Sequence, residues 1–545
     1  MFRMAMKSEK LDRIWGWVQR NMLLVIGLLY MGGSVPGLMS MPFAAHPGRI
    51  DEKALQLGVA YPQCGVTRAS EVVALRSRLA SRLSQRRNEG MVVDVGHEAR
   101  VLWDGMHWKS DARNRQHRLA WNRDGRYNST AYVYDVVEGT RSDGTESILL
   151  VFPMRCSTDD GASAASLAMS VGHGLSWYLQ DQEWLAKNVI VAYVDVSKYA
   201  GIHLAMDDLL SIMPQDRRVG QIQQSIIVDI QDGSVDWMDS SSIKMHGWNG
   251  QVPNFDMFLV ARRSIELFAP KLAVWSEKKG SRGKETELSR YYSSVVSLAR
   301  FVGKHAFGLS DGGHALLLER SIDALTVEFT SSRKAASKKF SSEIEGMKSM
   351  LQTCEGMIRA LNNLQERLHH STALYALAGP VSVIDIGVYM VCPGLLFMAQ
   401  CLKSYRSVTR VMSEKNKSIA WDSAVGAAVL ILMSLLGLYC AIQAMAVSYI
   451  VNGKTILYSF GTVWSVFRNL CMMIVVMVVL WKFCAHWAEL WAAPQKDKTT
   501  TRRHRAGDIR ATKAAFSAFI SSLAACLLLY RWSLAWILLS LTVPL

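Results

Sequence analysis

The distribution of apolar residues along the chain constrains its fold more than any single motif. The stretch Met22–Pro42 contains no charged residue. Roughly 330 residues follow in which nothing is long enough to cross a bilayer, since a helix needs about 20 apolar residues to do so. From about Ser371 onward, apolar stretches crowd the chain to its end. The sequence therefore predicts a chain that enters a membrane once, folds a large domain on one side and ends in a helical bundle.

Basic residues predict the orientation of these segments. Lys7, Lys10, Arg13 and Arg20 precede the first one, which indicates a transmembrane signal anchor at 22–42 after a cytosolic N-terminus at 1–21. A cleaved signal peptide is the alternative, because the string GSVPGLMS is small and contains proline. The later spans are expected at 381–402, 422–450, 466–487, 513–530 and 532–545, and the last two could form one helix.

Two loops rich in lysine and arginine, 403–417 and 488–513, then fall in the cytosol, as the positive-inside rule requires. These loops account for much of the net charge of +15, so the charge predicts no nucleic-acid partner. The residues 43–371 become a lumenal domain, and 372–545 a multi-span membrane domain. The sequon at Asn128 lies in the lumenal part and is a predicted glycosylation site.

The large domain alternates between strand-like and helix-like segments. Short β-branched runs separated by helical stretches predict an α/β fold, with a mostly parallel sheet and helices on both faces. A helix is expected at Ala162–Trp177. The expected strands are Ser147–Pro153, Asn188–Val196, Ser225–Ile230 and Asp323–Phe329.

One further segment, 343–370, shows an apolar stripe at helical spacing. Methionine and leucine residues recur there at steps of three and four, beginning at Met347 and ending at Leu368. This pattern predicts an amphipathic helix. It could pack on its own domain, lie on the bilayer surface or take a partner helix.

A search for catalytic chemistry finds only fragments. The string Gly308–Gly312 matches G-x-S-x-G, but no strand precedes it, so a glycine-rich loop is predicted rather than a nucleophile elbow. The acidic pair that begins at Asp159 follows a strand and precedes an alanine-rich helix. This arrangement resembles the metal-bridging segment of zinc aminopeptidases of the bacterial leucyl aminopeptidase type.

That resemblance extends to the fold but not to the metal chemistry. Only Asp159 and Asp229 fall at ligand positions, and they are interpreted as vestigial. No histidine is followed two residues later by aspartate, and no pair of adjacent glutamates occurs. No metal, no other cofactor and no catalytic residue is therefore predicted. Asp195 and Asp229 also fit simple capping at strand ends. The alternative is a membrane-bound zinc metallopeptidase, or a peptide-bond-forming enzyme, with a degenerate metal site.

Two longer strings carry a more specific resemblance. The segment Gly247–Asp256 matches a G-x-N-G-Q-x-P-N-x-D signature, and Arg320–Thr326 matches R-x-x-[DE]-A-L-T. In this order, and with this layout of spans, the chain resembles the GPI-anchor attachment protein 1 family, the aminopeptidase-like membrane subunit of the glycosylphosphatidylinositol (GPI) transamidase. The signature residues are Gly247, Asn249, Gly250, Gln251, Pro253, Asn254 and Asp256.

The resemblance implies a non-catalytic subunit in the endoplasmic reticulum membrane. It would help to present the GPI lipid, the proprotein with its C-terminal signal, or both, to a caspase-like subunit that carries the catalytic cysteine. Pro544 is matched to a family proline linked to GPI recognition. Without the family, the glycines, proline and Asn/Asp side chains of Gly247–Asp256 predict a rigid turn, which could serve an interface, a site or the fold alone.

Overall fold

The structure is a computed structural model. Apart from isolated positions, it describes residues 17–60, 69–88, 120–123, 130–155, 159–198, 201–231, 238–274, 286–308, 310–331, 340–364, 375–379, 382–412 and 532–544. The chain divides into two compact units, Met1–Ala45 with Ile384–Leu545, and His46–Val383. Asn128 and the expected spans 422–450 and 466–487 lie outside the described residues.

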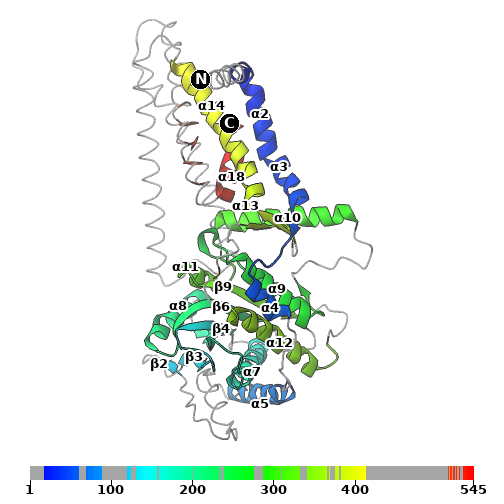
Figure 1. Cartoon of the computed structure of the whole chain (residues 1–545), viewed down its shortest axis with the longest axis vertical. Coiled ribbons are helices and arrows are strands. Elements are labelled where there is room, and N and C mark those ends of the chain that lie inside the picture. Colours follow the sequence, from blue (N-terminus) through cyan, green and yellow to red (C-terminus); the bar gives the residue numbers. More distant parts are fainter. Residues whose placement is uncertain are drawn as a thin grey trace. The chain divides into compact units, whose positions relative to one another are not determined.

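The unit His46–Val383 is built on a mixed sheet, of which β2, β3, β4, β6 and β9 are labelled in Figure 1. The strand order is β2-β3-β5-β4-β6-β9-β7-β8. In the centre, β5, β4, β6 and β9 run parallel, whereas β2, β3 and β7 pair antiparallel and β8 runs parallel to β7. The strands are β2 (Ala120–Arg123), β3 (Thr130–Val137), β4 (Glu146–Met154), β5 (Asn188–Asp195), β6 (Gln221–Ile230), β7 (Met238–Lys244), β8 (Ala273–Val274) and β9 (Asp323–Ser331).

The predicted α/β class is confirmed, but "mostly parallel" holds only for the central strands. Every residue of β5 is buried, and its valines and isoleucine suit a strand covered on both sides. The flanking strand β7 reads MDSSSIK, and its serines suit the half-solvated position of an antiparallel flank. Because β7 contains no apolar run, its sequence does not predict a strand.

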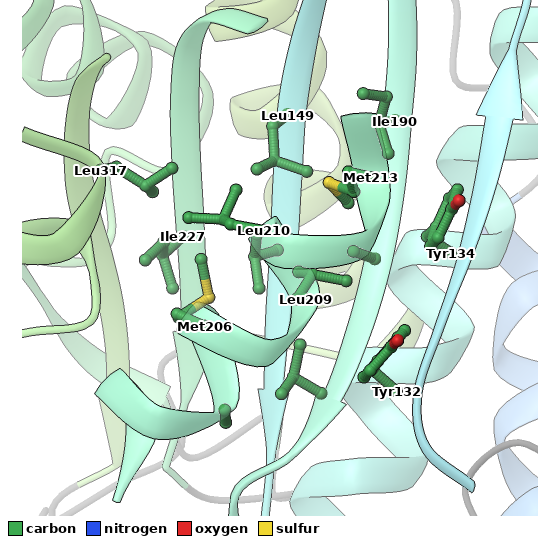
Figure 2. Close-up of a cluster of buried hydrophobic side chains, with 14 of the residues drawn as sticks. Tyr132, Tyr134, Leu149, Ile190, Met206, Leu209, Leu210, Met213, Ile227 and Leu317 are labelled. Carbon is green, nitrogen blue, oxygen red and sulfur yellow. The ribbon is translucent and has the colours of Figure 1, made fainter. Parts of the chain in front are cut away.

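Helices cover both faces of the sheet. On one face, α8 (Ile202–Ile212) places Met206 and Leu209 against Leu149 and Ile190 of the central strands (Figure 2). The short helix α11 (His314–Glu319) adds Leu317 to the same cluster. On the other face lie α7 (Asp159–Gln180) and α9 (Phe255–Phe268), and outside them α5 (Ala69–Asn88) and α4 (Lys53–Ala60). Short 3₁₀ turns occur at η1 (Met41–Ala44), η2 (Val196–Lys198), η3 (Met213–Gln215) and η5 (Trp248–Gly250).

The predicted amphipathic helix is α12 (Glu343–Asn362), and its stripe faces its own domain. Met347, Leu351 and Met357 are fully buried. Met357 lies beside Met257 of α9 and Leu325 of β9. Within the described part of 343–370, the stripe is thus covered by protein, and the bilayer-surface alternative does not apply to it.

A second, small sheet joins the two ends of this unit. Its order is β1 (His46–Pro47), β11 (Ser382–Asp385) and β10 (Tyr375–Leu377). In the antiparallel pair, His46 lies opposite Val383. The residues at which the chain enters and leaves the unit are therefore hydrogen-bonded neighbours. The long helix α10 (Glu287–Phe307) packs beside β10.

In the other unit, the described residues form mainly apolar helices. In it, helical residues Ile386–Arg410 are long and apolar enough to cross a membrane, and Met22–Gly33 with Val35–Ala44 qualify together as a pair bent by 42°. Pro36, at the start of the second helix, accounts for the break, because its ring cannot continue a preceding helix. The helices are α2 (Met22–Gly33), α3 (Val35–Ser40), α13 (Ile386–Tyr389), α14 (Val391–Met412) and α18 (Trp532–Thr542).

Close packing holds this unit together. Gly33 lets α2 approach α14, since a Cβ there would lie 2.6 Å from the carbonyl oxygen of Cys392. The indole Nε1 of Trp536 donates to the carbonyl oxygen of Gly33 at 2.7 Å, which ties α18 to α2. The predicted span 381–402 is displaced, because residues 382–385 form β11 and the helix begins at Ile386.

Candidate functional site

The carboxyl ends of the central strands carry an ion pair that involves a predicted vestigial metal position. Asp229, near the end of β6, accepts two hydrogen bonds from Arg155, which directly follows β4, at 2.6 and 3.1 Å. The Asp229 side chain is 6% exposed and that of Arg155 39%. Hydrogen bonding to Asp229 raises the pKa of Arg155 above its ordinary value, against the opposing effect of burial. The guanidinium group of Arg155 therefore occupies both carboxylate oxygens of Asp229.

A second acid continues the cluster on the neighbouring strand. Glu328 of β9 lies in register with Asp229, and the Nε2 of Gln231 bridges the two carboxylates at 2.8 and 3.0 Å. From β7, Lys244 donates to Glu328 at 2.7 Å and Ser242 donates at 2.9 Å. We call these residues the edge cluster: Arg155, Asp229, Gln231, Ser242, Lys244 and Glu328. Two cations balance two anions in it.

The edge cluster does not fit the zinc site of an aminopeptidase. Nowhere in the described ranges do three or more His, Cys, Asp or Glu side chains converge as metal ligands would. A metal at Asp229 would have to displace the guanidinium of Arg155. Two carboxylates without imidazole are also a poor donor set for zinc. The chemistry that this arrangement supports is charge neutralisation across strands.

The other acids predicted near the strand ends do not join the cluster. Asp195 caps the turn after β5, where its Oδ1 accepts from the backbone N–H of Ser197 at 3.0 Å. Asp159 begins α7, and the structure does not describe its side chain. For Asp195 the capping interpretation is the one observed.

The signature segment Gly247–Asp256 is a tight connection between β7 and α9. Gly247 donates its N–H to the carbonyl oxygen of Gln251 at 2.8 Å, which closes the turn around η5. Gly250 has φ +75°, and a Cβ there would lie 2.8 Å from the carbonyl oxygen of His305. Glycine is therefore required at this position by both the backbone conformation and the space.

Polar side chains of the segment are engaged inside the fold. Asn254 caps α9 by accepting from the N–H of Asp256 at 2.9 Å. Asp256, fully buried, accepts from the backbone N–H groups of Asp51 and Glu52, both at 2.9 Å. Pro253 is buried, and its carbonyl oxygen accepts from the hydroxyl of Tyr375 at 3.2 Å. Gln251 is exposed, and the Asn249 side chain is not described.

The two signature strings meet in space. The backbone N–H of Asn254 donates to Oδ1 of Asp323 at 3.0 Å, and Asp323 belongs to Arg320–Thr326. This contact makes the two strings neighbours in the fold. The first ties β7, α9 and the N-terminal segment together, and the second anchors it to β9. The geometry gives the signature a structural use, and among its described side chains Gln251 is exposed.

A buried histidine group lies beside this segment. Asp311 accepts from Nδ1 of His246 at 3.2 Å and from Nζ of Lys304 at 2.9 Å, with Nε2 of His314 at 3.4 Å. Burial alone would raise the pKa of Asp311, but the hydrogen bonds from His246 and His314 and the charge of Lys304 hold that pKa well below its ordinary value. The group stabilises a buried carboxylate.

The G-x-S-x-G string does not form a nucleophile elbow. Gly308 ends helix α10 in the left-handed conformation, so a helix and not a strand precedes the serine. Ser310 donates its hydroxyl to the carbonyl oxygen of Gly312 at 3.0 Å and lies 3.4 Å from Nε2 of His203. The loop interpretation therefore agrees with the geometry.

Elsewhere, Pro544 is exposed just after α18.

Sequence reasoning missed five members of the edge cluster: Arg155, Gln231, Ser242, Lys244 and Glu328. Arg155 and Glu328 did leave a signal, because each is a charged residue at the end of an apolar strand. Their pairing could not be read, since it depends on the order of the strands in the sheet.

Fold and site together define an α/β protein with attached apolar helices. At the carboxyl ends of its central strands, the opposite charges of the edge cluster neutralise one another. Residues 129–545 match the family model described as Gaa1-like, GPI transamidase component. The chain belongs to this family. The GPI transamidase component gaa1 of Schizosaccharomyces pombe is 26% identical over 283 residues, which cover 50% of this chain and 45% of that protein. GAA1 of Saccharomyces cerevisiae is 23% identical over 284 residues, covering 50% and 41%. The matches thus span less than half the length of these relatives.

Two solved structures are distantly similar. The Legionella pneumophila LapA aminopeptidase has a TM-score of 0.30 and 10% identity, with 63% of this chain and 75% of that chain covered. Glutaminyl cyclase of Porphyromonas gingivalis has a TM-score of 0.32 and 11% identity, with coverage of 54% and 97%.

Proposed function

We propose that this chain is a subunit of a GPI transamidase that helps to present the GPI lipid, the proprotein, or both, without performing the transamidation itself. Membership of the Gaa1-like family carries the first part of the proposal. The edge cluster supports the second, because Arg155 and Lys244 occupy the carboxylates that a metal-dependent peptidase would keep available. A caspase-like subunit would supply the catalytic cysteine.

The proposed location is the endoplasmic reticulum membrane, with the N-terminus cytosolic, several spans and residues 43–371 in the lumen. The apolar helical run Ile386–Arg410 and the bent pair that begins at Met22 are compatible with this topology. Pro544, at the exposed end of α18, keeps its proposed part in GPI recognition. Asn128 is the proposed glycosylation site.

In the test, variants of the chain replace the endogenous protein in the cells that make it. The amount of a GPI-anchored reporter at the cell surface is then measured. Asp159→Ala and Asp229→Asn should retain most anchoring, and the chain should copurify in mild detergent with a caspase-like protease homologue. Loss of anchoring by either variant in a complex that still assembles would instead support the metal-dependent alternative. Stoichiometric zinc in the purified complex that disappears in Asp229→Asn would do the same.

A further inference from the structure

Helix α10 carries an apolar stripe that the domain buries only near the C-terminal end of the helix, at Val302 and Ala306. Leu288, Tyr292, Val295, Ala299, Val302 and Ala306 follow one another at steps of three and four, so they share one face. Val302 and Ala306 are buried in the domain, whereas Leu288 is 63% and Tyr292 55% exposed. The stripe therefore continues beyond the edge of the domain that covers it.

The uncovered half is a regular part of the helix. The hydroxyl of Thr286 caps its start by accepting from the N–H of Ser289, and Gly308 ends it in the left-handed conformation. Further along, Phe301 packs on Tyr375 with ring centroids 6.2 Å apart. This packing holds α10 on the small sheet, since Tyr375 belongs to β10.

The small sheet is also where the chain leaves the unit. The apolar helix that begins at Ile386 follows Val383 by three residues, which span at most about 10 Å of chain. Residue Ala45, which follows the bent apolar pair, precedes β1 directly. If both apolar segments enter a bilayer, the sheet that carries α10 stays close to its surface.

The composition of α10 matches that location. Its polar side carries Arg290 and Arg300, together with Lys304, which is paired with Asp311, and Glu287 is the acidic residue of the helix. Cationic residues opposite an apolar stripe are typical of helices that lie in the interface plane of a membrane with anionic lipids. Tyrosine side chains also favour this region, because their rings are apolar and their hydroxyls polar.

We propose that the first half of α10, residues 287–297, lies on the surface of the lipid bilayer, with Leu288 and Tyr292 inserted among the lipid headgroups. The proposal rests on the membrane location given under the proposed function. It assigns a lipid contact to the α/β unit itself, in addition to the spans.

The test uses the full chain in the membranes of the cells that make it. The photo-crosslinking residue p-benzoylphenylalanine replaces Tyr292 or Leu288 in the apolar stripe, or Arg290 on the opposite side of the helix as the matched control. Leu28 of α2, which is 65% exposed, is the positive control for the membrane itself. After irradiation, adducts are identified by mass spectrometry. Tyr292 and Leu288 should give several-fold more phospholipid adduct than Arg290.

Three outcomes would overturn the inference. Adducts from Tyr292 to a second copy of the chain or to another protein would make α10 a protein interface. Lipid adducts from Leu28 together with none from Tyr292 and Leu288 would leave the proposed membrane location intact and remove α10 from the surface. Absence of lipid adducts at all four positions would contradict the membrane location as well.

Discussion

At the scale of single residues, the Arg155–Asp229 pair makes the most direct prediction. Arg155→Met leaves a nearly buried carboxylate without its cation, which should lower the free energy of unfolding by about 2 kcal/mol. The value is below that of a fully buried pair because Arg155 is 39% exposed. Thermal unfolding in detergent measures the loss. Adding Asp229→Asn should restore most of it, and a double variant less stable than Arg155→Met would contradict this account.

His203 predicts a pH dependence at the same scale. Burial, with a smaller effect of the nearby His314, lowers its pKa from 6.5 to about 4. Between these values the unfolded chain binds a proton that the folded chain does not. Stability should therefore fall as the pH drops, by about 2 kcal/mol from this residue between pH 7 and pH 5.

The control for this prediction is His203→Gln, which removes the titrating group. Thermal unfolding of both proteins at pH 7 and pH 5 isolates the contribution of His203 from that of the other histidines. The wild-type protein should lose more stability than the variant over this range. Equal losses would show that His203 does not carry the effect.

At the scale of elements, the turn Gly247–Asp256 makes a prediction about backbone fit. Gly250→Ala forces a side chain into φ +75° and places its Cβ against the carbonyl oxygen of His305 in α10. The expected loss is at least about 2 kcal/mol in the free energy of unfolding. Gly144→Ala is the matched control, because φ is +79° there and nothing lies within 4 Å. Its cost should be about 1 kcal/mol, and equal costs would reject the clash.

The elements also show what the sequence could predict and why. Asn188–Val196 was expected as a strand and appears as β5 (Asn188–Asp195), because a buried parallel strand needs an apolar run that can be read directly. The polar strand β7 was not predicted. For α12, periodicity identified the stripe but left open what it faces, because spacing alone does not distinguish a protein core from a lipid surface.

At the scale of the whole molecule, the candidate site depended on information that a single sequence does not hold. Arg155 and Asp229 are 74 positions apart, and they meet because β4 and β6 are neighbours in the sheet. Likewise, the contact between Asn254 and Asp323 joins two strings that the sequence analysis could only place in order. The order of the strands in the sheet determines both contacts, and a single sequence does not reveal that order.

The β1–β11 pairing also makes the distance between the two ends of the α/β unit independent of the number of residues in it. His46 and Val383 face each other across one ladder, so a few ångströms separate the point of entry from the point of exit. Residues gained or lost anywhere between Pro47 and Ser382 leave that gap unchanged. Insertions and deletions in the loops of the unit can therefore accumulate during evolution without changing the separation at which the flanking apolar segments begin.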